Sequence, residues 1–239
     1  MTEAAELAQL NILLERSESF EEAIDACFPE TGPVFAVASQ QHELVAAACV
    51  LCIEHASVLR AAFSIVAPNS GSAVLRLQYE ALLRAVWLLY AATPAHVDKL
   101  GRTLDLEAEQ AAKNLPGYME MLEAVVKNAP QGLSLPLAEF NQYSRHALNS
   151  FVHSGIHPLR RMREGYPMQM AATMVRFSNG LMHFAYRLLA SLSSSQRRMD
   201  RVTHVYLEFT DCVPMAEEAL EGTVNGEKAE HESSARREI

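Results

Sequence analysis

Residues 34–66 constrain the fold of this chain most, because apolar side chains occupy the segment almost without interruption. Only Glu43, Glu54 and Arg60 carry a formal charge within it. The spacing of its Ala, Val, Leu and Ile residues matches a helix. A helix that is apolar around most of its circumference has to be covered by other elements. The segment therefore predicts a long helix at the centre of the fold.

Helical spacing of apolar residues recurs along the chain, whereas strand-like alternation and fixed-period repeats do not. With 49% hydrophobic residues and only ten Gly and ten Pro, the composition favours helices. We predict an all-α protein with one domain at 1–221, a bundle of about seven or eight helices, and a disordered polar tail at 222–239. The predicted helices span approximately 2–27, 34–66, 73–92, 95–114, 118–127, 137–152, 168–192 and 195–221.

Pro and Gly mark the breaks between these helices. Thr93 and Pro94 predict the start of the helix at 95–114. Residues 129–136, which include two Pro, predict a connection before the next long helix. Gly155 and Pro158 predict the end of that helix, and the basic residues 160–165 are expected to form a further connection.

The chain predicts a cytoplasmic protein without a membrane anchor. Its N-terminus is acidic, unlike a secretory leader, and its longest apolar run, 45–53, is far below the ~20 residues that a spanning helix needs. Cys49-x-x-Cys52 has the spacing of a redox or zinc motif, but it lies inside a helical pattern without a second cysteine pair. We interpret both cysteines as small buried helix residues, and we predict no metal site and no cofactor.

Charge is distributed unevenly along the sequence, whose net charge is −9. Residues 145–201 contain nine Arg and only two acidic residues, Glu164 and Asp200. Arg binds phosphate in a bidentate geometry, so this block favours contact with phosphate groups. The alternative is that these arginines pair with the acidic N-terminal half inside the fold.

Within the basic block, residues 145–157 are the strongest candidate for a functional site. On a helix, His146, Asn149 and His153 would share one face. Imidazoles move protons near neutral pH, and an adjacent Arg145 would hold a phosphate. We therefore predict these four residues to be catalytic. The alternative is a buried polar network that fixes helix register.

The same region also allows a metal site or a small-ligand pocket. His153 and His157 have metal-ligand spacing, but Gly155 and Pro158 interrupt the helix on which they would have to lie. A small-ligand pocket between the Trp87 helix and the His153 helix is a further option. We also expect substrate-binding residues around the stripe, which are His157, Arg160 and Arg161.

A second constellation lies on the predicted helix 73–92. Arg76, Glu80 and Arg84 recur every four residues beside Tyr79, and form one polar line on an apolar helix. They form either an intrahelical Arg–Glu–Arg ladder, or a wall that faces His146 and His153 across a cleft. We include all four among the predicted substrate-binding residues.

Residues 75–88 and 148–159 together resemble an uncharacterised family of bacterial all-helical proteins, and the likeness extends across most of 30–195. More loosely, Arg145, the polar His146 and the later His153 resemble the Arg-polar…His signature of the HEPN superfamily. That resemblance implies a helical bundle that dimerises and acts as a metal-independent ribonuclease. It also implies that Arg145 binds phosphate and that His153 transfers or positions a proton.

The sequence therefore predicts a metal-independent, HEPN-like ribonuclease or nucleic-acid-targeting effector of a bacterial toxin or phage-defence system. RNA and a second copy of the chain are its expected partners. The alternative is a non-catalytic helical binding or regulatory module, in which the His/Asn stripe serves packing or dimerisation. The acidic net charge of −9 favours this alternative, because nucleic-acid-binding proteins are usually basic.

Overall fold

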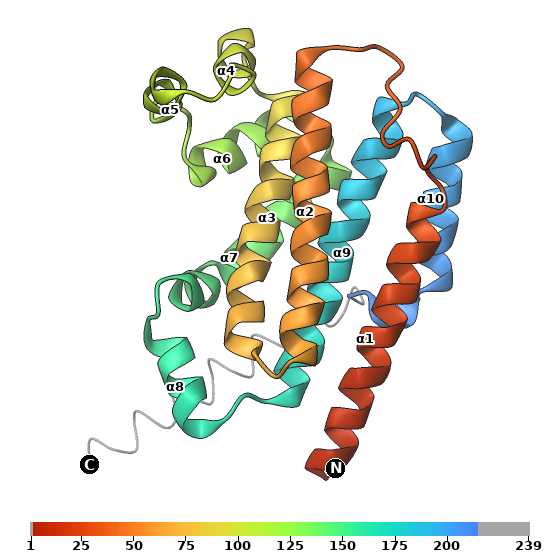
Figure 1. Cartoon of the computed structure of the whole chain (residues 1–239), viewed down its shortest axis with the longest axis vertical. Coiled ribbons are helices and arrows are strands. Elements are labelled where there is room, and N and C mark those ends of the chain that lie inside the picture. The colour runs from red at the N-terminus through yellow and green to blue at the C-terminus, as the bar shows by residue number, and fades with distance from the viewer. Residues whose placement is uncertain (1, 215–239) are drawn as a thin grey trace.

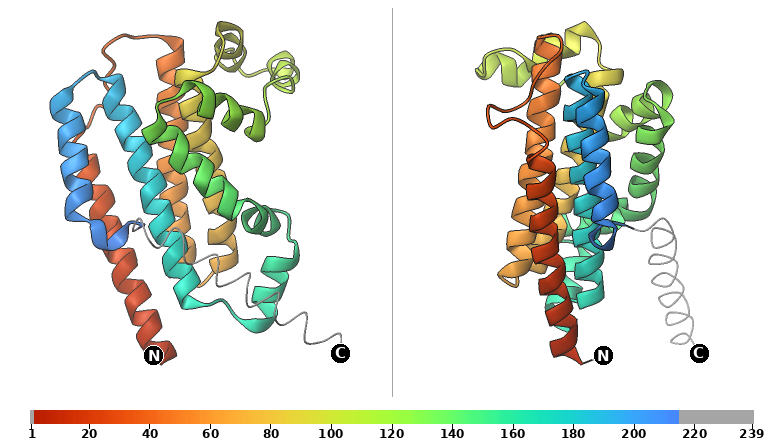
Figure 2. Two further views of the ribbon diagram at one scale, coloured as in Figure 1. Left: turned by 180° about the vertical axis from the view of Figure 1, so that it is seen from behind. Right: turned by 90° about the vertical axis from the view of Figure 1, so that its right-hand side faces the viewer.

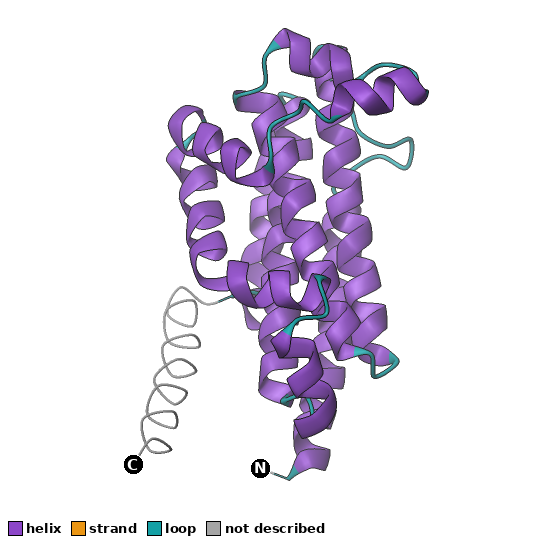
Figure 3. Ribbon diagram, turned by 90° about the vertical axis from the view of Figure 1, so that its left-hand side faces the viewer, coloured by secondary structure: helices purple, strands orange, loops and turns teal. Residues whose placement is uncertain are grey.

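A computed structural model describes residues 2–214, and within them every regular element is helical (Figures 1 and 3). The helices are α1 (Glu3–Asp25), α2 (Gln40–Ser64), α3 (Pro68–Tyr90), α4 (Pro94–Leu100), α5 (Leu106–Ala112), α6 (Tyr118–Asn128), α7 (Gln131–Val152), α8 (Ile156–Glu164), α9 (Met168–Leu192) and α10 (Gln196–Glu208), followed by the 3₁₀ turn η1 (Thr210–Cys212). The all-α prediction is confirmed. The described residues form ten α-helices rather than seven or eight, because 95–114 divides into α4 and α5 and because 156–164 is helical.

The long apolar helix α2 packs against other helices on one face only, because Val50, Leu51 and Val58 on its other face are exposed, so the prediction that it is covered on all sides is wrong. α2 and α3 form an antiparallel pair, and α9 packs against both of them (Figures 1 and 2). α1 and α10 cover the other side of α9, while α6 and α7 cover α3. One apolar core runs through these helices, and its largest fully buried side chains include Leu59 of α2, Trp87 of α3 and Met182 of α9.

Helix α2 is also long and apolar enough to cross a membrane, judged by length and composition alone. A core helix of a soluble protein meets the same criteria. One face of α2 packs into the core, and Cys49 and Cys52 lie fully buried there. The interpretation of both cysteines as small buried helix residues is confirmed.

Local hydrogen bonds set the helix starts. α2 begins at Gln40 rather than at residue 34, because the Ser39 side chain accepts a hydrogen bond from the His42 N–H and caps the helix. Thr93 caps α4 in the same way, through the His96 N–H, as predicted. α9 has the predicted bounds, Met168–Leu192.

Helix α7 begins at Gln131, so the predicted connection at 129–136 is wrong. Pro136 lies inside α7, where it removes one hydrogen bond, to the carbonyl of Gly132. Ser134 and Leu137, on either side of the proline, are buried against the core, and this packing outweighs the lost bond. Tertiary contacts thus override the local preference of proline.

The chain turns sharply between α7 and α8. α7 ends at Val152, Ser154 adopts a left-handed backbone with φ of 54°, and Gly155 is the N-cap of α8. A Cβ on Gly155 would approach Ser150 Oγ to 2.7 Å, and the Ser150 hydroxyl accepts a hydrogen bond from the His157 N–H at 3.0 Å. The predicted helix end is confirmed, but the predicted connection at 160–165 is wrong, because most of it is helical.

Candidate functional site

The predicted catalytic stripe lies on the outer side of α7. His146 and His153 are exposed and Asn149 is half-buried, whereas Leu148 and Phe151 turn into the core. Among the described residues, no hydrogen bond joins the three stripe side chains to one another. The interpretation of the stripe as a buried polar network is therefore wrong, because the apolar residues of α7 determine which face is inside and leave the stripe in solvent.

Helix α8 adds positive charge beside the end of this stripe. It buries no side chain, and it bears Arg160, Arg161 and Arg163 against a single acid, Glu164. Arg160 Nε donates to the Glu164 carboxylate at 2.8 Å, and this hydrogen bond lowers the pKa of Glu164. The surface of α8 thus combines these cations with three exposed apolar side chains, Ile156, Leu159 and Met162.

His157, the histidine predicted to bind substrate, lies at the start of α8 and is half-buried. Its ring stacks on Phe151 with 6.0 Å between the ring centroids. His153 is the C-cap of α7, and the turn at Ser154 and Gly155 separates it from α8, so the two imidazoles do not share a helix face. Within the residues that the structure describes, no group of three metal-binding side chains is found.

Arg145 lies at the boundary between the exposed and buried sides of α7, and its side chain contacts α6. Its Nη1 donates to the sulfur of Met119 at 3.8 Å, and Asn141 Nδ2 donates to the same sulfur at 3.8 Å. The guanidinium therefore faces away from His146, its neighbour in the sequence, which is exposed.

On α3, the Arg76–Glu80 step of the predicted Arg–Glu–Arg ladder is formed by a hydrogen bond. Arg76 is buried, and its Nε donates to Glu80 Oε1 at 2.8 Å. Tyr79 is fully buried, its hydroxyl donates to the carbonyl of Leu137, and burial raises its pKa well above the ordinary value. Arg84 is half-buried, and burial lowers its pKa while Glu80 raises it.

The structure brings the α3 line near Arg145 rather than near the exposed histidines. The guanidinium carbon of Arg76 lies 4.0 Å from the Tyr118 ring centroid, and Tyr118 precedes Met119, the residue that Arg145 contacts. The predicted substrate-binding residues thus separate into two groups. One group, which includes the buried Arg76 and Tyr79, lies on α3, and the other, His157, Arg160 and Arg161, lies on α8.

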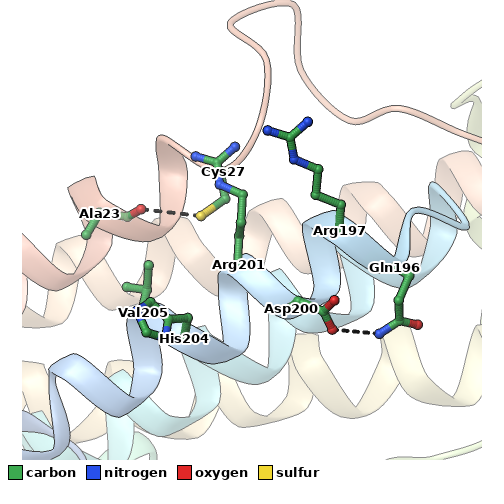
Figure 4. Close-up of a pocket in the computed structure, with 8 residues that line it drawn as sticks. All are labelled: Ala23, Cys27, Gln196, Arg197, Asp200, Arg201, His204 and Val205. Atoms are coloured by element: carbon green, nitrogen blue, oxygen red, sulfur yellow. Dashed lines mark hydrogen bonds between the residues drawn. The ribbon is translucent and has the colours of Figure 1, made fainter.

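An open groove of about 650 Å³ lies elsewhere, between the end of α1 and α10 (Figure 4). Arg197 and Arg201 extend over it, and Arg201 Nη2 donates to the carbonyl of Ala26 at 2.9 Å. Burial raises the pKa of Cys27 in its wall, so the thiol stays protonated. Sequence reasoning did not single out this groove, although Arg197 and Arg201 belong to the basic block that it identified.

A second hollow, of about 320 Å³, lies between the segment before α2 and the C-terminal end of α9. His42 and Tyr90 are among the residues that line it. Neither of these two hollows lies between the Trp87 helix and the His153 helix, where a small-ligand pocket was an option.

Burial also determines the chemistry of the cysteine pair. Burial raises the pKa of Cys52 to about 12 and raises that of Cys49 well above its ordinary value. Both thiols therefore remain protonated, and a protonated thiol is neither a nucleophile nor a metal ligand.

Comparison with known proteins places the chain in a family. A family model, described as a family of unknown function (DUF6988), matches residues 49–215, which is well over half of the chain. The match includes α3, α6, α7 and α8, and it agrees with the predicted resemblance to an uncharacterised helical family. Curated proteins and solved structures gave no match. The chain belongs to the family of unknown function DUF6988.

Proposed function

We propose that the exposed surface of α7 and α8 binds RNA, and that the protein is a nucleic-acid-targeting effector. The observation that carries this proposal is the adjacency of the exposed His146 and His153 to a helix with three arginines and one acid. Arginine contacts with phosphate dominate the affinity of proteins for nucleic acid. The acidic net charge of −9 describes the chain as a whole, whereas α8 by itself carries three arginines against one acid.

The finer proposal is RNA cleavage without a metal. His146 lies within α7 and His153 is its C-cap, so the two lie about two turns, roughly 10 Å, apart along the α7 axis. One imidazole would accept the proton of a ribose 2′-hydroxyl as its oxygen attacks the phosphorus. The other would protonate the departing 5′-oxygen, leaving a cyclic phosphate. Asn149, between them, would orient the phosphate, as expected of a HEPN-like enzyme in a toxin or phage-defence system.

Labelled RNAs incubated with the purified protein in EDTA test both levels of the proposal. We expect cleavage by the wild type, at least about a hundredfold slower cleavage by His146→Ala and His153→Ala, and RNA binding that weakens with salt. His204→Ala is the matched control, since His204 is an exposed helical histidine on α10. Cleavage that is equal in the wild type and in both stripe variants would refute the catalytic assignment.

Loss of the α8 charge tests binding separately from cleavage. Arg161→Gln with Arg163→Gln should weaken RNA binding, whereas Arg197→Gln on α10 should not. RNA binding that survives in the stripe variants without any wild-type cleavage would favour the alternative, a non-catalytic binding module. Unchanged affinity in the α8 double variant would contradict the RNA surface itself.

Homodimerisation remains part of the proposal. The outer face of α2 exposes Val50, Leu51 and Val58, and exposed apolar side chains on one helix face suit association with a second copy. Sedimentation of the wild type should give the mass of a dimer, and Leu51→Glu should give that of a monomer. A wild-type monomer at micromolar concentration would contradict this expectation.

A further inference from the structure

Met119, in the first turn of α6, receives more hydrogen-bond donors than its chemistry suits. Asn141 Nδ2 and Arg145 Nη1 both donate to its sulfur at 3.8 Å. A thioether is a weak acceptor, while one of the two donors is a charged guanidinium. Two strong donors from α7 thus converge on an atom that poorly satisfies either.

Arg76 of α3 packs on Tyr118, the residue before Met119, and is a buried cation with hydrogen-bond donors that have no partner. Its side chain is 2% exposed, and Nε is paired with Glu80. Nη1 and Nη2 are both buried and have no hydrogen-bond partner. Packing on the Tyr118 ring at 4.0 Å offsets part of the desolvation of the guanidinium, but a ring face does not replace hydrogen-bond acceptors.

Donors therefore exceed acceptors between α3, α6 and α7. Arg76 packs on Tyr118, while Arg145 and the Asn141 amide nitrogen contact the adjacent Met119. Glu80, which pairs with Arg76, is 41% exposed, and Asn141 Oδ1 is a buried acceptor without a partner beside several donor hydrogens of the two guanidinium groups. A buried region with an excess of donors and positive charge is suited to an oxyanion, whose oxygens accept several hydrogen bonds at once.

We propose that Arg76, Asn141 and Arg145 form a binding site for a phosphoryl group, which the Met119 side chain closes in the unliganded protein. Methionine has three rotatable side-chain bonds, so its thioether leaves the site without a movement of α6. Phosphate oxygens then replace the sulfur as acceptor for Asn141 and Arg145, and Arg76 supplies the second positive charge. The site lies on the α6 side of α7, and it goes beyond the RNA surface because it operates whether or not RNA is bound or cleaved.

Methyl-labelled methionine makes Met119 a direct reporter. The full chain carrying ¹³C-methyl methionine is titrated with inorganic phosphate at constant ionic strength, and the resonance is assigned with Met119→Leu. We expect a saturable shift of the Met119 resonance, while that of Met162, 76% exposed on α8, stays in place. A Met119 resonance that phosphate leaves unmoved overturns the proposal.

Three further measurements identify the source of the phosphoryl group and the residues that bind it. If adenosine 5′-monophosphate shifts the Met119 resonance at a lower concentration than inorganic phosphate does, and adenosine does not shift it, the site binds the phosphate of a nucleotide. If the two phosphates act at equal concentrations, the site binds free phosphate. Met119→Ala should bind phosphate more tightly than the wild type, and Arg145→Gln should weaken binding about tenfold or more, with Arg197→Gln as control. Binding by Arg145→Gln that equals the wild type overturns the site.

The double variant His146→Ala/His153→Ala separates this site from the RNA surface. Phosphate should shift Met119 in that variant as it does in the wild type, even where RNA cleavage is lost. If phosphate binding disappears with the two histidines, the anion binds on the exposed face of α7 and the buried site is overturned. If phosphate binding remains but wild-type protein neither binds nor cleaves RNA, only the RNA proposal fails.

Discussion

The hydroxyl oxygens of Ser72 and Tyr166 lie 2.6 Å apart and join α3 to the segment between α8 and α9. Ser72 is fully buried and also donates to the carbonyl of Pro68, so the Tyr166 hydroxyl is the donor of the pair. Burial raises the pKa of Tyr166 to about 12, which keeps this hydroxyl protonated. Since α8 buries no side chain of its own, Tyr166 is an anchor that holds the basic helix against the bundle.

Replacing this anchor should loosen α8 without unfolding the protein. Tyr166→Phe keeps the ring, which packs near Phe63 and Phe151, and removes one hydrogen bond worth about 1 kcal/mol. We expect faster amide hydrogen exchange in α8 and weaker RNA binding, with exchange in α3 nearly unchanged. Tyr143→Phe, at a half-exposed position on α7, is the control. Equal exchange of α8 in the wild type and in Tyr166→Phe would show that the hydroxyl pair does not hold the helix.

In the ion pair between α1 and α2, removing the acid should destabilise the protein more than removing the buried cation. Arg60 is buried at 5% exposure, and its guanidinium pairs with Glu21 beside the Ser57 hydroxyl. Glu21→Ala leaves the cation unpaired, and should lower the free energy of unfolding by roughly 2–3 kcal/mol. Arg60→Met removes the buried charge itself and should cost less.

Urea denaturation followed by the fluorescence of buried Trp87 measures both variants of this pair. Glu22→Ala, at an exposed position of α1, serves as the control and should change the free energy by less than about 0.5 kcal/mol. The explanation fails if Arg60→Met proves more destabilising than Glu21→Ala.

His183 should make the protein less stable in acid. Burial, with Arg187 nearby, lowers its pKa from 6.5 to about 3, and its ring stacks on Tyr206 with centroids 4.3 Å apart. Below pH 6.5 the unfolded chain binds a proton at this histidine that the folded chain does not. Stability is therefore complete above pH 6.5 and falls by about 1.4 kcal/mol per pH unit as the pH drops towards 3.

The variant His183→Phe isolates this effect from the titration of carboxylates. Its free energy of unfolding should vary less between about pH 5 and pH 7 than that of the wild type. The difference between the two proteins, measured by urea denaturation, should grow with decreasing pH at the slope given above. Parallel pH curves would mean that His183 takes up its proton equally in the folded and unfolded states.

The exposed histidines of α7 should contribute little to stability. His146→Ala and His153→Ala each should change the free energy of unfolding by less than about 0.5 kcal/mol, because neither side chain is buried. His183→Ala, by contrast, opens a cavity in the core and should destabilise by a few kcal/mol. Thermal melting of the three variants distinguishes these outcomes. A large loss of stability in either α7 variant would restore the view that the stripe serves packing.

Several elements could be predicted from the sequence because their signals are local. The apolar pattern of α9 and the cap at Thr93 depend on residues within one or two turns, and both match the structure. α8 and the early start of α7 could not be predicted in this way. Pro136 opposes a helix locally, and the burial of Ser134 and Leu137 outweighs it. The arginines of α8 are good helix formers and Arg160 pairs with Glu164 four residues on, but the short segment has no apolar periodicity that would mark it as a helix.

The same distinction applies to the candidate site. The sequence determined that this is a helical protein and that His146, Asn149 and His153 share a helix face, because helix periodicity fixes the angles between side chains. Only the tertiary structure decided that this face meets solvent and that Arg145 turns to Met119. The rotation of a helix about its axis follows from the packing of all its apolar residues against its neighbours, which no single segment encodes.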